Sequence, residues 1–341
     1  MIENELRTSF ARHEVLVPDA LPLVPAIDSG AQRVRRRRRV TAGVLAALAV
    51  VAAVAVPPLA PHLVAHSRHL AGPGGFDTPP RETVRGPLNF LLLGLDRRPA
   101  DPPSTVARAD TIMIVHVNAA HDHGFLISVP RDLLVDIRGH GLDKINAAYA
   151  YGGRNLATEV VSDVTGLTFD GTAEVRFEGL SRLTDALGGV PMCLDQRVVS
   201  AHTKRTFEKG CRRLDGGEAL DLLRQRYNLP GGALDRDRHA RQYVTSLLDE
   251  AGNGNLLTSP AKLTKVIGAA GDAMTLDIKK VSIIDLAWQL RSLRGGDLTG
   301  VEVPTTEGAY HGTQALRPAT DAAGLYAALR ADTVGEWLAN R

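Results

Sequence analysis

The sequence predicts an α/β domain with a central mixed sheet under helices, carried behind a single membrane-spanning helix. Apolar runs of strand length alternate along the chain with amphipathic helical segments, and this interleaving is typical of layered α/β folds. One uncharged apolar stretch near the N-terminus has the length of a bilayer-spanning helix. With 341 residues, 44% of them hydrophobic, the chain can bury a large core and still carry appendages.

The segment before the domain divides into three parts. Residues 1–39 carry Pro and charge without periodicity, which predicts a mostly disordered tail. Residues 40–60 hold no charge and would span about 30 Å as a helix. The arginine run at residues 35–39 places the N-terminus in the cytoplasm. Residues 61–87 are rich in Pro and Gly and predict an extracytoplasmic linker.

A cleaved signal peptide is the competing interpretation of the apolar run. Nearly forty residues precede the run, and the run is longer than the apolar part of a usual signal peptide. We therefore expect a single-pass anchor in the cell membrane, with residues 88–341 outside the cytoplasm. The arginine run could instead bind nucleic acid, but its place beside the apolar segment and the net charge of +2 argue against a nucleic-acid partner.

Strands are predicted wherever a short apolar run ends in a turn residue or a charge. The run at residues 89–96 ends in Gly and Asp, and the runs at 111–119 and 124–130 flank a short turn and predict a hairpin. Further strands are expected at residues 173–177, 190–195 and 300–304.

Helices are predicted between these strands. Residues 178–189 form an amphipathic segment closed by Gly188 and Gly189, and Ser259 with Pro260 forms a helix start. The expected helices are at residues 156–166, 178–189, 216–227, 237–252, 259–274, 281–296, 322–330 and 335–339.

The two cysteines, Cys193 and Cys211, do not form a C-x-x-C pair, so zinc or thioredoxin-type chemistry is not indicated. A domain outside the cytoplasm permits a disulfide, and this one would stabilise the fold by about 3 kcal/mol. Two buried free thiols are the alternative.

Arginine and aspartate side chains gather at the ends of the first three predicted strands. Asp96, Arg97 and Arg98 follow the first strand, Arg108 and Asp110 lead into the second, and Arg131 and Asp132 end the third. Binding and catalytic groups of α/β folds are commonly exposed at strand ends. Each group alone is typical of a surface ion pair, but its recurrence at successive strands indicates a site.

A fourth group lies on two predicted helices and holds Arg224, Arg226, Asp235, Arg238, Arg241 and Gln242. Its last three members have the spacing of one helical face. Arginine forks bind phosphate oxygens bidentately, and carboxylates can hold a Mg²⁺ ion that bridges those oxygens. The set therefore suits a pyrophosphate. No nucleophile elbow, phosphate-binding glycine loop or zinc-protease motif is present in the sequence.

Six segments together resemble, in order, the signatures of the LytR–CpsA–Psr family of cell-wall glycopolymer ligases over roughly residues 88–256. They are LLLGLDRR, RADTIMIVHV, ISVPRDLLVDI, DKINAAYAYGG, LDGGEALDLLRQR and LDRDRHARQ. The resemblance implies an α/β/α sandwich with an apolar groove for a polyprenyl tail, and makes residues 88–341 the catalytic domain. It also implies transfer of a glycopolymer from polyprenyl pyrophosphate onto peptidoglycan, through a phosphodiester.

The resemblance also implies roles for individual residues. Asp96 and Asp110 match the family's magnesium-binding and catalytic aspartates, and Arg131 matches a catalytic arginine that holds the pyrophosphate. Asp237 is an alternative to Asp235. The remaining matches to substrate-binding positions are Arg98, Lys144, Asn146, Arg224, Arg226, Asp235, Arg238, Arg241 and Gln242.

Two loops depart from the family pattern. Residues 97–109 are proline-rich and residues 228–235 are slightly long; both border the expected site and could alter polymer or acceptor preference. A pyrophosphatase acting on the same lipid and a non-catalytic wall-polymer binder are the alternatives, and the presence of Asp96 and Asp110 argues against the binder. The Ala- and Arg-rich composition, with a disulfide outside the membrane, favours an actinobacterial member. The sequence does not identify the glycopolymer.

Overall fold

The computed structural model describes residues 84–95, 108–225, 227–252, 260–279, 282, 285, 286 and 289–341. Within these ranges no helix combines the length and the apolar character needed to cross a membrane. The predicted tail, the anchor at residues 40–60 and nearly all of the linker lie outside the described residues.

A six-stranded mixed sheet forms the centre of the described domain, with the strand order β11-β6-β1-β2-β3-β12. β1 and β2 are antiparallel, as are β2 and β3, whereas β6 lies parallel to β1 and β12 parallel to β3. The strands are β1 (Leu88–Leu95), β2 (Ala109–Val117), β3 (Gly124–Val129), β6 (Gly171–Arg176), β11 (Met274–Ile278) and β12 (Leu298–Glu302). The mixed sheet expected from the sequence is therefore confirmed.

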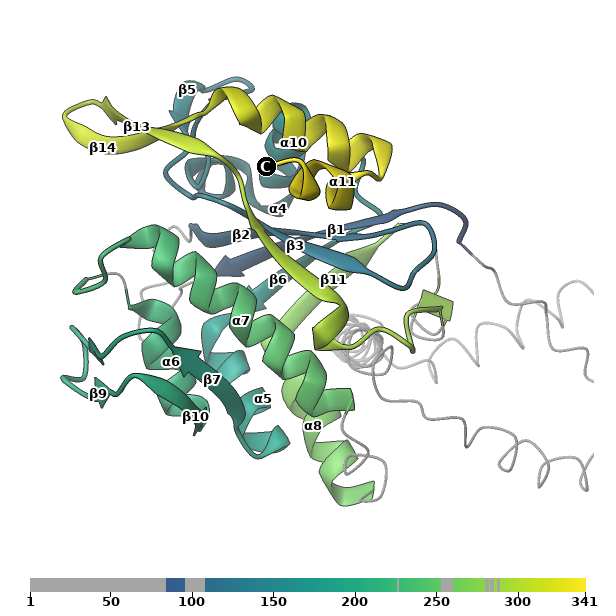
Figure 1. Ribbon diagram of the computed structural model, residues 1–341, viewed down its shortest axis with the longest axis vertical. Helices are drawn as coiled ribbons and strands as arrows, with labels where there is room; N and C mark the ends of the chain where they lie inside the picture. Colours follow the sequence, from purple (N-terminus) through teal and green to yellow (C-terminus); the bar gives the residue numbers. More distant parts are fainter. Residues whose placement is uncertain are drawn as a thin grey trace, which may run out of the picture. The chain divides into compact units, whose positions relative to one another are not determined.

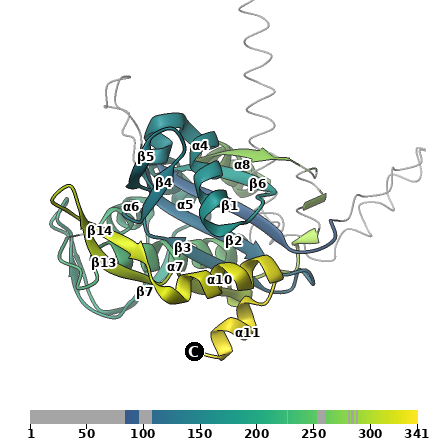
Figure 2. The same ribbon diagram turned by 90° about the horizontal axis from the view of Figure 1, so that it is seen from above.

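Helices cover both faces of this sheet and form an α/β/α sandwich (Figure 1). One layer contains α4 (Ala147–Thr165), α10 (Thr320–Ala331) and α11 (Val334–Ala339). The other layer contains α5 (Phe177–Leu187), α6 (Gly216–Arg224), α7 (Ala233–Gly252) and α8 (Pro260–Ala273). Figure 2 looks onto the first layer, with the sheet beneath α4 and α10.

Alternation along the strands divides the core between the two layers. Leu91, Leu93 and Leu95 of β1 belong to the cluster under α4 and α10. Leu92 packs against the cluster that α5, α6 and α7 build on the other face. Successive side chains of a strand point to opposite faces, so one apolar strand supplies both cores.

The strand ends that carry the predicted site lie along one edge of the sheet. Leu95 is in register with Arg176 of β6 and with Ala109 of β2, while Ser128 of β3 is in register with Glu302 of β12. The last residues of β1, β3, β6 and β12 and the first residues of β2 therefore meet there. We call this end of the central strands the site edge.

Several elements differ from the sequence-based expectation. α6 ends at Arg224, earlier than expected, because Gln225 has an extended backbone. The strand expected at residues 190–195 is β7 (Val190–Leu194), which pairs with β10 (Gly210–Leu214) outside the central sheet. The helix expected at residues 281–296 lies largely outside the described residues.

Several short strands were not predicted from the sequence, most of them because they lack a strong apolar pattern. They include the hairpins β4 (Leu134–Ile137)/β5 (Gly141–Lys144) and β13 (Thr305–Tyr310)/β14 (Thr313–Pro318), the small pair β8 (Val198–Val199)/β9 (Thr206–Phe207), and the edge strand β11. His311 and Gly312 supply the positive φ angles of 48° and 72° that the β13–β14 turn needs.

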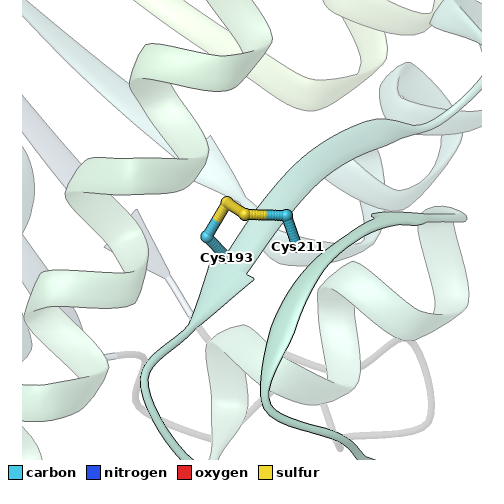
Figure 3. Close-up of a disulfide and its surroundings, with 2 residues drawn as sticks. All are labelled: Cys193 and Cys211. Atoms are coloured by element: carbon cyan, nitrogen blue, oxygen red, sulfur yellow. A yellow bond between two sulfur atoms is a disulfide. The ribbon is translucent and has the colours of Figure 1, made fainter.

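The predicted disulfide between Cys193 and Cys211 is confirmed. The two residues stand directly opposite each other in the β7–β10 register, with Cα atoms 3.9 Å apart, and their sulfurs are bonded (Figure 3). The bond therefore joins β10 to β7, the strand that lies beside α7.

Candidate functional site

The site edge holds a linked group of charged side chains. Asp110 is the second residue of β2, and Arg131 lies two residues after the end of β3; the Arg131 guanidinium donates from Nη1 to Asp110 Oδ1 at 2.5 Å. Asp132 lies on the other side of this arginine, with its Oδ2 3.4 Å from Arg131 Nε. Its Oδ1 lies 3.1 Å from Nζ of Lys144, the last residue of β5.

These side chains are partly buried, which restricts their orientation but leaves them accessible to a ligand. The side chains of Arg131 and Asp110 are 16% and 24% exposed. Arg131 is held between Asp110 and Asp132, so its guanidinium has one orientation at the end of β3. Asp132 was noted in the sequence beside Arg131 but not selected as a site residue, because only the structure brings Lys144 to it.

Asn146 is hydrogen-bonded to the backbone of Arg131. Its backbone N–H donates to the Arg131 carbonyl at 3.2 Å, and its side chain is buried. Its Oδ1 has no hydrogen-bond partner among the described residues. A buried amide oxygen of this kind is stabilised by a donor from water or from a ligand.

The start of α7 brings a second charged group, and its members face different neighbours. Asp235 accepts hydrogen bonds from the Gly231 N–H at 2.9 Å and lies 3.1 Å from Nη2 of Arg238. Arg238, about half exposed, also reaches Asp195 at 3.5 Å. It therefore points toward the end of β7.

Arg241 points in the other direction, toward β12. Its Nη2 lies 3.9 Å from Oε2 of Glu302, and its side chain is 12% exposed. Nη1 has no hydrogen-bond partner within the described part of the chain, and burial lowers the pKa of this guanidinium. Arg238 and Arg241 therefore contact different carboxylates, although their spacing predicted that they share one helical face. Gln242, the next residue of α7, is half-buried.

A buried ion pair connects the two charged groups. Arg236 Nη2 lies 3.0 Å from Asp237 Oδ1, and both side chains are almost fully buried. Burial raises the pKa of Asp237, while the positive charges of Arg236, Arg241 and Arg131 act against that rise. Asp237 therefore feels the charges of both groups, and the start of α7 lies close to the end of β3.

An apolar cavity of about 190 Å³ runs beneath the site edge, between the sheet and the α5–α7 layer. Its lining is almost wholly apolar and includes Phe90 and Gly94, so it follows β1 for about 13 Å. Phe177 lines the cavity at the site edge, and the Arg224 guanidinium carbon lies 6.0 Å from the centre of that ring. The cavity thus extends from a cationic rim into the apolar interior.

The structure brings together most of the described residues that the sequence singled out. Asp110, Arg131 and Lys144 form one network, and the charges of Arg131 and Arg241 both act on Asp237. Asp96, Arg98 and Arg226 lie outside the described residues. The apolar cavity was expected only from the family resemblance, because its lining comes from strands and helices throughout the domain and no local pattern marks it.

The described residues fit a magnesium ion shared with a substrate better than an all-protein metal site. No group of three or more His, Cys, Asp or Glu side chains suited to a metal occurs in the described ranges. Mg²⁺ commonly binds one or two carboxylates and completes its shell with water and substrate phosphates. Asp110 provides one such carboxylate at the site edge.

The chain matches the LytR_cpsA_psr family over residues 66–325. It is 31% identical over 274 residues to the cell wall biosynthesis protein LcpA of Corynebacterium glutamicum, covering 68% of this chain and 53% of LcpA. It is 32% identical over 187 residues to the polyisoprenyl-teichoic acid–peptidoglycan teichoic acid transferase TagU of Oceanobacillus iheyensis, covering 53% of this chain and 57% of TagU. The chain thus spans about half the length of the curated relatives it matches, and the Corynebacterium relative fits the expected actinobacterial source.

Solved structures share the fold. TagT bound to LIIa-WTA superposes with a TM-score of 0.60 at 22% identity, over 74% of this chain and 94% of TagT. Bacillus subtilis TagV gives a TM-score of 0.59 at 22% identity, over 75% of this chain and 99% of TagV. At this level of identity the likeness concerns the α/β/α architecture alone.

Proposed function

The chain belongs to the LytR_cpsA_psr family, and on that premise we propose that it transfers a glycopolymer from a polyprenyl-pyrophosphate carrier onto peptidoglycan. The observation that carries this proposal is the apolar cavity beneath a rim of arginines and aspartates. An amphiphile with a long apolar tail and a polyanionic head matches both parts. The named activities of relatives such as TagU support the same substrate class.

The proposed reaction is a phosphoryl transfer. The oxygen of a peptidoglycan hydroxyl attacks the phosphorus that carries the glycopolymer and forms a new P–O bond. The bond from that phosphorus to the bridging oxygen breaks, and polyprenyl phosphate leaves with the electron pair. The hydroxyl proton passes to a carboxylate, for which Asp96 is our preferred candidate because Asp110 already accepts a hydrogen bond from Arg131.

The cationic side chains supply charge stabilisation in this scheme. Arg131 is pre-oriented by Asp110 and Asp132, and Arg224 stands at the rim of the cavity. Lys144 and Arg241 extend the positive charge along the site edge. Phosphoryl transfer depends mainly on positioning and charge neutralisation, so these groups suffice without a protein nucleophile.

Magnesium is part of the proposal. Asp110, together with Asp96, would hold the ion, and its charge would offset the negative charge of the two phosphates. The remaining predicted contacts, from Arg98, Arg226, Asp235, Arg238 and Gln242, are proposed to orient the pyrophosphate and the first sugars.

We also propose the membrane location expected from the sequence. A helix at residues 40–60 would anchor the chain, with the N-terminus in the cytoplasm and the catalytic domain outside. A tethered domain meets a membrane-bound carrier at high effective concentration, which suits a lipid-linked donor.

A reconstituted assay tests this function. The full chain in liposomes is given a polyprenyl-pyrophosphate glycan, peptidoglycan and Mg²⁺, and polymer attachment is measured. Arg131→Ala should lower transfer about 100-fold or more, because a pre-oriented charge at the reacting phosphate is lost. Arg138→Ala is the matched control, since Arg138 is 70% exposed and pairs only with Asp163 among the described residues.

Three results would count against the proposal. Unchanged transfer in both Arg131→Ala and Asp96→Ala would remove the site assignment. Release of the glycan phosphate without attachment to peptidoglycan would indicate a hydrolase. Binding of the lipid without any reaction would indicate a wall-polymer-binding protein.

A further inference from the structure

Beside the site edge, exposed aromatic and apolar side chains gather on two hairpins and the first turns of α4. We call this set, made of His140, Leu142, Tyr151, Tyr310 and His311, the aromatic platform. Of the three large apolar side chains that are strongly exposed in the described residues, two belong to it, Leu142 at 46% and Tyr151 at 47%.

Contacts within the platform hold its rings in place. The rings of His140 and Tyr151 stack in parallel, with centroids 4.2 Å apart and an interplanar angle of 6°. The Tyr310 hydroxyl donates to the backbone carbonyl of Leu142, which joins the β13–β14 hairpin to the β4–β5 hairpin. The Tyr310 and His311 rings meet edge to face at 4.1 Å. An exposed apolar surface that is fixed in this way is typical of a binding site.

Polar groups border the rings. The Tyr151 hydroxyl donates to Asp143 Oδ2 at 2.6 Å. Burial opposes ionisation of Asp143, yet this hydrogen bond keeps the pKa of Asp143 below its usual value. The positive charge of Arg108 also lowers the pKa of Asp143, so the Arg108 side chain lies near this carboxylate.

The platform is continuous with the proposed catalytic residues. Lys144 ends β5 and joins Asp132 at the site edge to the Gln314 carbonyl of β14, at 3.1 and 2.7 Å. Arg108 stands two residues before Asp110. A molecule lying on the rings would therefore reach the Asp110–Arg131 pair.

Flat exposed rings bordered by hydroxyl, carboxylate and basic groups match the chemistry of a sugar. The C–H face of a pyranose packs on an aromatic ring, and its hydroxyls form hydrogen bonds at the ring edges. A lipid tail would use only the apolar part of this surface.

The position of the platform indicates that it binds the acceptor of the transfer reaction and not the lipid-linked donor. The elements that carry the platform, β5, α4 and the β13–β14 hairpin, lie on the α4 side of the sheet (Figures 1 and 2), whereas the apolar cavity lies between the sheet and the α5–α7 layer. In phosphoryl transfer the attacking and leaving oxygens lie roughly in line through the phosphorus. If the leaving polyprenyl phosphate lies toward the cavity, the attacking hydroxyl arrives from the α4 layer.

We propose that the aromatic platform binds the glycan strand of peptidoglycan and presents its hydroxyl to the site edge. This inference rests on the proposed function, because it assumes that the lipid tail occupies the cavity. Tyr151 and Leu142 provide the contact surface, and Tyr310 positions the β4–β5 hairpin. The platform thus determines which acceptor is used.

Binding and transfer measured separately test this inference. The full chain in detergent is titrated with soluble, uncrosslinked peptidoglycan glycan strands, and the affinity is obtained by calorimetry. Tyr151→Ala should weaken strand binding about tenfold and raise the acceptor KM by a similar factor, because the stacking surface is lost. Tyr151→Phe is the matched control, since it removes the Asp143 hydrogen bond but keeps the ring, and should bind within about twofold of wild type.

Donor measurements separate this inference from the proposed function. Binding of the polyprenyl-pyrophosphate donor should be unchanged in Tyr151→Ala. Tyr227→Ala, which removes an exposed tyrosine from the loop after α6, should leave strand binding unchanged. A second variant, Leu142→Ala, should reproduce the loss if Tyr151→Ala proves poorly folded.

Each outcome supports or overturns the assignment of the aromatic platform as the glycan-binding surface. Unaltered strand binding in both Tyr151→Ala and Leu142→Ala, with normal transfer by wild type, overturns the platform and leaves the proposed function intact. Loss of donor-polymer binding in place of strand binding also overturns it. Platform-dependent strand binding without any transfer by wild type would support the platform and contradict the proposed function.

Discussion

The two faces of the central sheet use similar side chains for different purposes. On the face under α4 and α10, Leu91, Leu93 and Ile127 are fully buried. On the opposite face, Leu92 of the same strand and Val115 of β2 are only partly buried, because they line the apolar cavity. The filled face therefore contributes mainly stability, and the cavity face gives up packing in return for a binding volume.

The largest expected effect is a difference between neighbouring leucines of β1. Leu93→Ala should lower the free energy of unfolding by about 2–5 kcal/mol, because it leaves a void in a filled core. Leu92→Ala removes the same atoms beside an existing cavity and should cost less than about 1.5 kcal/mol. Urea denaturation of the two variants measures the difference; equal losses would show that the two faces are packed alike.

The disulfide should be the next largest contribution, and it acts on the cavity side. Replacing Cys193 and Cys211 together by Ser opens a link between residues 18 apart in sequence and should cost about 3 kcal/mol. β7 lies beside α7, so loss of the bond should also increase hydrogen exchange in α7 more than in α10. Equal increases in both helices would contradict this assignment to one layer.

Filling the cavity should separate binding from stability. Val115→Phe places a ring in the cavity lined by Val115 and Phe177. We expect at least a tenfold loss of affinity for a polyprenyl-pyrophosphate lipid, roughly the equivalent of two displaced methylene groups. The melting temperature should change little. Unchanged lipid affinity would show that the tail binds elsewhere. Val115→Ala is the control, because it enlarges the cavity instead of filling it.

The smallest expected effect is a pH dependence of the filled face. His116 on β2 is fully buried between Asn89 and Asp332, with its Nδ1 and Nε2 at 2.8 and 2.9 Å from their side-chain oxygens. Burial lowers the pKa of His116, although Asp332 opposes the shift. Below the ordinary value of about 6.5 the unfolded chain binds a proton that the folded chain excludes.

Stability should therefore fall as the pH drops below about 6.5 toward the folded-state pKa of His116. His116→Gln should reduce the slope of unfolding free energy against pH in this range, whatever its effect on absolute stability. His239 of α7 provides the comparison on the cavity face, since burial lowers its pKa as well. An unchanged slope in His116→Gln alone would assign the pH dependence to other groups.

Much of the fold followed from local pattern. The apolar runs and their turns located β1, β2, β3 and the β2–β3 hairpin, because alternation and turn residues act over a few neighbouring positions. Gly188 ends α5 with a positive φ of 91°, as its position after an amphipathic segment predicted. The weakly patterned β5 strand and β13–β14 hairpin were missed for the same reason, since few of their side chains are buried.

The candidate site was predictable in its members but not in its contacts. Asp110 and Arg131 stand at strand ends in the sequence, and the sheet register makes them neighbours. Arg238 and Arg241 were expected to share a target, yet tertiary neighbours draw them to Asp195 and Glu302. Helical spacing specifies the direction in which a side chain leaves the backbone, whereas the ion pair depends on what stands opposite.

The sequence by itself determined the kinds of element, the charged residues at their ends and the two cysteines that could pair. Tertiary structure alone decided the strand order, the cavity and the aromatic platform. β6 lies beside β1 although long segments separate them in the chain, and Tyr310 meets Leu142 across 168 positions. Local preferences act over a few neighbouring residues. A cavity forms only where surfaces from distant parts of the chain leave a space between them, and a platform forms only where such parts come together.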